Sequence, residues 1–338
     1  MQIQELSKTI TGGETYLITG ASGFIGFSVV MALYYMNREV LSVPCKLILM
    51  VRDRNKAFRK FGNVLNDPDI TVILCDNEDK IQIDGHLDWI IHTAAVTKKR
   101  TFEISPADTL NSNVMGIYNC LELAKKKSIK GMVFISSVQV YGKTDEEEIE
   151  ENTFGPLNSM KAEAVYPESK RMGEMLCWAY NRQYHIPVKC VRLFHAYGKG
   201  EDYDNGTFLS DFFTDIIAGR NIHIKGSGEE IRNLCHISDV VRGIFYVLYK
   251  GEVGEAYNIA SENVNYSIKE IAELLCRAAW KSGRKTRVVT ENQEGVKNSL
   301  IKKQIPNVEK LKALGWKEER NDLEYNFEEI IEEILGQG

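Results

Sequence analysis

"TYLITGASGFIG", residues 15–26, is the most informative segment of the chain, because apolar residues run directly into three glycines spaced three residues apart. A glycine after a buried strand permits a tight turn into a helix, a second lets the backbone approach a pyrophosphate, and a third lets the helix pack closely on the strand. The N-terminus of that helix offers free N–H groups and a partial positive charge to phosphates. The stretch therefore predicts a dinucleotide-binding unit, although its GxxGxxG spacing departs from GxGxxG. The residues expected to bind the cofactor here are Gly20, Gly23, Phe24, Ile25 and Gly26.

Short apolar runs alternate with longer helical patterns along most of the chain. The runs are apolar throughout, which is typical of strands buried on both faces of a parallel sheet. The predicted strands are residues 15–19, 46–51, 71–75, 89–93, 132–136, 187–194 and 255–260, and the clearest helical stretches are 111–127 and 167–184. This alternation predicts an α/β fold with a doubly wound (Rossmann) parallel sheet.

After about residue 193 the alternation weakens, and we expect a smaller C-terminal lobe that binds the substrate. The predicted dinucleotide-binding Rossmann domain covers residues 10–192 and a return segment, 233–262. The predicted substrate-binding lobe covers residues 193–232 and 263–338. The strand at 255–260 then returns the chain to the main sheet.

Composition and charge exclude several classes of protein. The chain has 338 residues, 43% of them hydrophobic, so it can bury a large core. Its formal charge of -5 argues against a nucleic-acid surface, and no apolar run is long enough to cross a membrane. Seven cysteines lie mostly inside apolar runs without CxxC or metal-ligand spacing. We therefore expect reduced thiols, no metal site, no signal peptide and a cytoplasmic location.

The residues after the second and third strands are expected to contact the adenosine half of the cofactor. An acidic residue after the second strand hydrogen-bonds a free ribose 2′-hydroxyl, whereas an arginine accommodates a 2′-phosphate. The sequence supplies both, as Arg52 and Asp53, with further positive charge at Arg54 and Lys56. We expect NADP(H) to be favoured over NAD(H). Asp76, after the third strand, is the expected partner of the adenine amino group.

A serine after the fifth strand and a Tyr-x-x-x-Lys pair supply the chemistry of proton transfer. Tyr166 and Lys170 stand four residues apart and therefore share one helix face. A phenol has a reference pKa of about 10, so it is a poor base at neutral pH unless a cation stabilises the phenolate. Lys170 supplies that charge and can hold the nicotinamide ribose. Ser137, four residues before Tyr141, can steady the substrate oxygen.

With these residues placed, the chain resembles the extended short-chain dehydrogenase/reductases, and within them the NAD(P)-dependent epimerase/dehydratase family that acts on nucleotide sugars. The resemblance runs from about residue 15 to 316. It is carried by "TGASGFIG", "IIHTAA", "NSNVMGIYNCLELA", "SSVQVYG", "YPESK", "RLFHAYG" and "IRNLCHISDVV". It implies that Ser137, Tyr166 and Lys170 are the catalytic triad and that the backbone of Ala94 and Ala95 lies beside the dinucleotide. Asn113 matches a family asparagine near the active-site helix, where a helix-packing role is an equal alternative.

The resemblance also indicates the substrate class. In the family, the arginine at the position of Arg232 grips the diphosphate of a nucleotide-diphosphate sugar, and a guanidinium fork suits phosphate oxygens. His195 stands where the epimerases commonly carry Asn, and is expected either to contact substrate or to be structural. Val138 and Gln139 replace the acidic pair of the 4,6-dehydratases, and Gln139 can hydrogen-bond substrate but cannot transfer a proton.

The sequence therefore predicts an oxidoreductase or epimerase that transfers a hydride at a carbinol or ketone of a nucleotide-diphosphate sugar. Epimerase and ketoreductase outcomes stay open. The alternatives are a sugar-nucleotide 4,6-dehydratase, an NADPH-dependent reductase of a non-nucleotide carbonyl compound, and a non-catalytic NADP(H)-binding sensor. The resemblance further implies a homodimer packed through the helices at 111–127 and 167–184.

Overall fold

The computed structural model describes residues 10–203, 206–291 and 302–336, and its centre is a seven-stranded parallel sheet. The strand order is β10-β6-β5-β4-β1-β2-β3. The strands of this sheet are β1 (Thr15–Thr19), β2 (Lys46–Val51), β3 (Ile70–Leu74), β4 (Trp89–His92), β5 (Gly131–Ser137), β6 (Val188–Leu193) and β10 (Ala256–Ile259). From the boundary between β1 and β4, successive strands are added outward in opposite directions, which defines a doubly wound sheet. Ligands of such sheets bind at the carboxyl ends of the strands beside this boundary.

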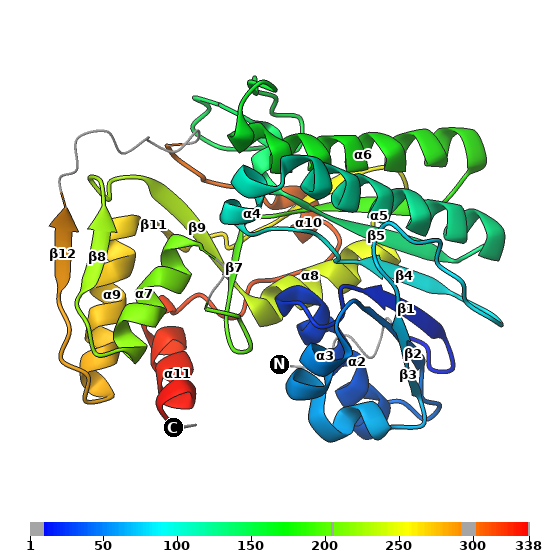
Figure 1. Cartoon of the computed structure of the whole chain (residues 1–338), viewed down its shortest axis with the longest axis horizontal. Coiled ribbons are helices and arrows are strands. Elements are labelled where there is room, and N and C mark those ends of the chain that lie inside the picture. The colour runs from blue at the N-terminus through cyan, green and yellow to red at the C-terminus, as the bar shows by residue number, and fades with distance from the viewer. Residues whose placement is uncertain (1–9, 204–205, 292–301, 337–338) are drawn as a thin grey trace.

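Helices cover both faces of this sheet (Figure 1). On one face α5 and α6 lie side by side, and on the other lie α2, α3 and α8. The helices that belong to this part are α2 (Phe24–Glu39), α3 (Arg54–Phe61), α4 (Lys99–Ile104), α5 (Pro106–Lys127), α6 (Val165–Tyr184), α8 (Ile237–Lys250) and α10 (Glu309–Lys312). Short 3-10 turns are η1 (Gly62–Asn66), η2 (Val138–Tyr141) and η3 (Ala162–Ala164).

The central strands are apolar throughout because both of their faces are covered. All five residues of β1 and all four of β4 are buried, and the two strands pair in parallel with Ile18 opposite Ile91. Burial of such aliphatic side chains contributes about 1.5–3 kcal/mol each. The predicted doubly wound α/β fold is confirmed.

The remaining elements form a smaller lobe at the left of Figure 1. They are β7 (His195–Tyr197), α7 (Phe208–Ile217), β8 (Ile222–Lys225), β9 (Ile231–His236), β11 (Asn265–Ser267), α9 (Ile268–Lys281), β12 (Val288–Glu291) and α11 (Leu323–Gly336). Strands β11, β9 and β7 form one small sheet, and β12 and β8 form another. These elements have their own apolar core, which includes Phe213 and Phe327. The predicted domain boundaries stay a prediction, and the segment around Val308 and Trp316 packs into the main core.

All seven cysteines are free thiols, and six of them are buried. No helix within the described ranges combines the length and the apolar character that crossing a membrane requires.

Candidate active site

A cavity of about 600 Å³ opens at the carboxyl ends of β1 and β4, where the strand order reverses. This volume is typical of a small-molecule site. It is lined by the glycine turn, by the ends of β2, β4, β5 and β6, by the first turns of α2 and α6, and by the segment that leads into α7. The sequence-predicted residues in its lining are Gly20, Gly23, Phe24, Ile25, Gly26, Arg52, Asp53, Ala94, Ala95, Ser137, Tyr166, Lys170 and His195.

The glycine turn needs glycine at two positions for different reasons. Gly20 has a φ of +64°, and a Cβ there would lie 2.7 Å from the Cα of Ala94. A Cβ on Gly26 would lie 2.4 Å from the carbonyl oxygen of Gly20 and 2.8 Å from Oγ1 of Thr93. A larger residue at either position would therefore push α2 away from the ends of β1 and β4.

The N-terminus of α2 faces the cavity without a side-chain cap. Gly23 is the N-cap residue, and the first turn of the helix holds no acidic side chain. Phe24, Ile25 and Gly26 in that first turn line the cavity. Free N–H groups and the positive end of the helix dipole suit a phosphate at this place. These residues fit the pyrophosphate of a dinucleotide.

Charged side chains gather where the sequence predicts the adenosine ribose. Arg52 lines the cavity and is exposed. Asp53 caps α3, because its side chain accepts hydrogen bonds from the N–H groups of Asn55 and Lys56 at 2.8 and 3.0 Å. These bonds lower the pKa of the Asp53 carboxyl. Lys56 itself pairs with Asp202 at 2.6 Å, which brings the loop before α7 to the end of β2.

Asn77 lines the cavity at the end of β3, whereas Asp76 is exposed and is not among the lining residues of the described chain. The Asp76 carboxylate accepts a hydrogen bond from the N–H of Asn77 at 2.8 Å. Asn77 is buried and donates to Ser112 of α5 at 3.1 Å. The assignment of Asp76 to the adenine amino group stays a prediction, with Asn77 as the neighbour that the geometry favours.

Ser137, Tyr166 and Lys170 converge on the cavity from β5 and α6. Tyr166 and Lys170 are 9% and 3% exposed. The Tyr166 ring stacks on Phe102 with 5.4 Å between centroids, and Lys170 Nζ lies 5.8 Å from the Tyr166 ring centroid. Burial raises the pKa of Tyr166 to about 12, and its hydrogen bond with Ser137 opposes that shift. The predicted triad is therefore assembled in one place, next to the nucleotide-binding turn.

The Lys170 side chain reaches from α6 to β5 of the central sheet. Its ammonium group donates to the carbonyl oxygen of Ile135 at 2.7 Å and lies 4.8 Å from the centroid of the Phe134 ring. Burial lowers the pKa of Lys170 to about 8, and the nearby charge of Glu174 opposes that shift. A lysine with this pKa stays largely protonated at neutral pH and can stabilise a phenolate.

Asn113 connects α5 to both sides of the cavity. Its side-chain oxygen accepts from the N–H of Val96 at 2.7 Å, and its amide donates to Ser169 of α6 at 3.0 Å. Ser169 in turn donates to the carbonyl oxygen of Tyr166 at 2.7 Å. Asn113 therefore holds the loop after β4 against the first turn of α6.

His195 lines the same cavity, at the start of β7. Burial lowers its pKa to about 4, the charge of Arg232 adds to that shift, and the side chain of Gln304 opposes it. The imidazole is therefore neutral near pH 7 and carries no additional proton to donate as an acid.

Arg232 and Gln139 are not among the residues that line the cavity in the described chain. Arg232 is buried in β9 and donates to the carbonyl oxygens of Ile231 and Lys302 at 2.8 and 3.5 Å. Gln139 is exposed in η2, beside the buried Val138. Their predicted roles with substrate stay predictions.

The loop that leads into α7 contributes cavity residues that the sequence analysis did not identify. They are Glu201, Asp202, Thr207 and Phe208. Phe208 packs edge-on against His195, with 5.7 Å between ring centroids. This loop carries no periodic pattern and no recognised motif, so sequence alone offers no signal that it lies over the end of β2.

Comparison with known proteins agrees with this architecture. The model of the NAD dependent epimerase/dehydratase family matches residues 16–260. UDP-glucuronic acid decarboxylase 6 of Arabidopsis thaliana is 26% identical over 267 residues, which cover 79% of this chain and 75% of the relative.

Two solved structures share the fold. UDP-N-acetylglucosamine 4-epimerase from Methanobrevibacter ruminantium M1, at 19% identity, superposes with a TM-score of 0.81 over 97% of this chain and 100% of its own. UDP-glucuronic acid 4-epimerase from Bacillus cereus, at 20% identity, superposes with a TM-score of 0.78 over 96% of this chain and 100% of its own. That second structure contains UDP-glucuronic acid and NAD.

Proposed function

The chain belongs to the NAD dependent epimerase/dehydratase family, and we propose that it transfers a hydride at a carbinol or ketone carbon of a nucleotide-diphosphate sugar. The observation that carries the proposal is the convergence of Ser137, Tyr166 and Lys170 on the cavity that the uncapped N-terminus of α2 also faces. A non-catalytic sensor has no need of a proton-transfer triad, so this convergence favours an enzyme.

The side chains divide the proton transfer between them. A nicotinamide dinucleotide held at the glycine turn and at the first turn of α2 would supply the hydride chemistry at the sugar carbon. Tyr166 removes the proton from the sugar hydroxyl, and the Lys170 ammonium stabilises the phenolate that makes this possible. Ser137 donates a hydrogen bond to the substrate oxygen while charge develops on it. Burial of the tyrosine and lysine excludes water from the transfer.

Three outcomes are compatible with this chemistry. Return of the hydride to the opposite face of the keto sugar gives an epimer, and reduction with release of product gives a ketoreductase. The relative named as a UDP-glucuronic acid decarboxylase supports a third outcome. A ketone β to a carboxylate accepts the electron pair of the breaking C–C bond, so a keto sugar acid can lose CO2 without a further acid group.

Loss of water is the outcome that the residues support least. Elimination needs one group that takes a proton and another that protonates the leaving hydroxyl. Val138 is buried and apolar, and the amide of exposed Gln139 does not titrate. His195 is neutral near pH 7 because burial lowers its pKa to about 4. Mass spectrometry of the product tests this, and a product lighter by one water would contradict it.

For the cofactor, NAD(H) is better supported than the NADP(H) that the sequence favoured. Lys56 and Lys60 both form ion pairs with Asp202, at 2.6 and 3.3 Å, so the Asp202 carboxylate offsets part of the positive charge near the predicted ribose site. Asp53 and Glu201 are further acidic residues in the cavity lining. A 2′-phosphate would meet these carboxylates, whereas a free 2′-hydroxyl can donate a hydrogen bond to one of them.

A homodimer through α5 and α6 is supported by apolar side chains exposed on the two helices. Met175 and Trp178 of α6 are 59% and 52% exposed, and Met172 and Tyr118 are also exposed. Exposed apolar side chains that gather on adjacent helices are typical of an association surface.

Free buried thiols are consistent with the predicted cytoplasmic location.

The experiment that tests the substrate class is a thermal-shift screen of nucleoside diphosphates, their sugars, NAD(H) and NADP(H). A ligand at a hundred times its dissociation constant stabilises the folded chain by about 2.7 kcal/mol. We expect stabilisation by a nucleotide sugar and by NAD(H). Stabilisation by a dinucleotide alone, with turnover of a simple carbonyl compound, would favour the non-nucleotide reductase.

A further inference from the structure

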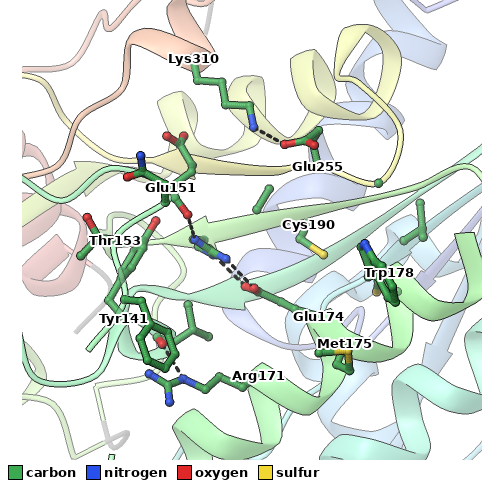
Figure 2. A pocket seen from close by; sticks show the side chains of 18 residues that line it. Tyr141, Glu151, Thr153, Arg171, Glu174, Met175, Trp178, Cys190, Glu255 and Lys310 are labelled. Carbon is green, nitrogen blue, oxygen red and sulfur yellow. Dashed lines mark hydrogen bonds and ion pairs between the residues drawn. The ribbon is translucent and has the colours of Figure 1, made fainter. Parts of the chain in front are cut away.

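Glu174 stands one helical turn after Lys170 on α6, so the two side chains are neighbours on the helix surface. They face different cavities. Lys170 lines the active-site cavity, whereas Glu174 lines a second cavity of about 540 Å³ between α6, β6 and β10. Figure 2 looks into this second cavity and shows Glu174 reaching from α6 toward the strands.

The Glu174 carboxylate is fixed by three hydrogen bonds. Arg192 of β6 binds it with two parallel contacts, from Nε to Oε1 at 3.0 Å and from Nη2 to Oε2 at 2.7 Å. Ser136 of β5 donates to Oε1 at 2.6 Å. Arg192 is itself fixed, because its Nη1 donates to the carbonyl oxygen of Glu151 at 2.7 Å. Such a bidentate, charge-assisted arrangement fixes the position of a carboxylate.

The side chains of Glu174 and Arg192 are only 16% and 14% exposed, so this ion pair lies in a poorly solvated region, where charges interact more strongly than in water.

Lys170 lies beside this carboxylate, because the Lys170 ammonium donates to the carbonyl oxygen of Ile135 and Glu174 accepts from the next residue of β5, Ser136. The titratable side chains that face Lys170 are Tyr166, Glu174, Cys177, Cys190 and His92. Burial raises the pKa of Tyr166 and of Cys177 and lowers the pKa of His92 to about 3, so these three groups are neutral near pH 7. Lys170 and Glu174 make no direct ion pair within the described residues, so the Glu174 charge acts through space in a poorly solvated region, where charges interact strongly.

We propose that Glu174 is a positioning residue that keeps Lys170 protonated at neutral pH, and that Arg192 and Ser136 hold it in place for this purpose. The inference rests on the proposed function, because only a charged Lys170 can stabilise the Tyr166 phenolate.

The direct test is to titrate the Lys170 ammonium by NMR of the full chain labelled in its lysines, without dinucleotide or sugar. The Lys170→Met variant assigns the signal. In Glu174→Gln we expect the Lys170 pKa to fall by at least about one unit, which is a tenfold weaker binding of its proton. An unchanged Lys170 pKa would overturn the proposal.

Two further variants separate the charge from structural damage. Glu174→Gln leaves the Arg192 guanidinium unpaired, whereas the double variant Glu174→Gln/Arg192→Met removes both charges together. We expect the double variant to keep the lowered Lys170 pKa, and Arg192→Met alone not to lower it. If Arg192→Met alone lowers the pKa as far as Glu174→Gln does, packing rather than the carboxylate controls Lys170, and the proposal fails.

A pH profile links the titration to catalysis. The basic limb of kcat/KM reports loss of the Lys170 proton, so Glu174→Gln is expected to move that limb to lower pH. A uniform loss of activity at every pH would contradict the positioning role. The NMR titration needs no substrate, so a lowered Lys170 pKa in a protein that converts no nucleotide sugar would overturn the proposed function and leave the electrostatic inference intact.

Discussion

Replacement of Lys170 by Met is expected to stabilise the fold at neutral pH while it abolishes turnover. Burial lowers the pKa of Lys170 from 10.5 to about 8 in the folded chain. One pKa unit corresponds to about 1.4 kcal/mol, so the buried ammonium lowers stability by about 3 kcal/mol below pH 8. Because the unfolded chain binds this proton more tightly than the folded chain does, the loss of stability is largest below pH 8. It disappears as the pH rises toward 10.5.

Urea unfolding of the chain and of Lys170→Met at pH 7 and pH 10 measures this effect. We expect the variant's advantage to be larger at pH 7 than at pH 10 by about 2.5 kcal/mol. Lys189 is also buried and titrates, but it is present in both proteins and cancels. Lys126→Met, at an exposed position of α5, is the matched control and should show no such pH dependence. A stability difference that is the same at both pH values would refute the desolvated-ammonium account of Lys170.

Three further predictions concern the ligands. Gly26→Ala places a Cβ 2.4 Å from the Gly20 carbonyl oxygen, so we expect a loss of about 1–3 kcal/mol in stability and weaker dinucleotide binding. The control Gly336→Ala adds its Cβ in open space and should change neither stability nor binding. Arg52→Ala should weaken NADP(H) more than NAD(H) by calorimetry, and tighter binding of NADP(H) than NAD(H) by the unmodified chain would contradict the charge argument built on Asp202. Arg232→Ala should weaken nucleotide-sugar binding by about 1.5–3 kcal/mol with little change for the dinucleotide, whereas equal losses for both ligands would mean that this arginine is structural.

The strands of the main sheet could be predicted to within one residue at each end, because strands buried on both faces are apolar throughout and their ends coincide with turn residues. The prediction was weakest at the start of α5. The helical pattern places this start at residue 111, whereas the helix begins at Pro106. A proline at the first helical position is a recognised start signal, and it extends the helix by a polar turn that carries no apolar periodicity.

The convergence of the three proposed catalytic residues could be predicted because their geometry is local. Tyr166 and Lys170 share a helix face by their spacing alone, and Ser137 ends a strand whose burial is evident from its composition. The contacts that hold Glu174 beside Lys170 could not be predicted in this way. Arg192 lies 18 residues after Glu174, on a strand whose register against α6 depends on the packing of the whole sheet. The loop of Asp202 reaches Lys56 across 146 residues, and no local pattern encodes that contact.

Turnover by the chain and by Tyr166→Phe is the decisive measurement for the proposed reaction of a nucleotide-diphosphate sugar. Both proteins are incubated with NAD(H) and a panel of nucleotide-diphosphate sugars, including sugar acids, and the products are followed by mass spectrometry and chromatography. We expect the chain to convert at least one of these sugars and Tyr166→Phe to be slower by about 10²–10⁴-fold, with nearly unchanged dinucleotide affinity. Full activity of Tyr166→Phe on the same sugar would contradict this expectation.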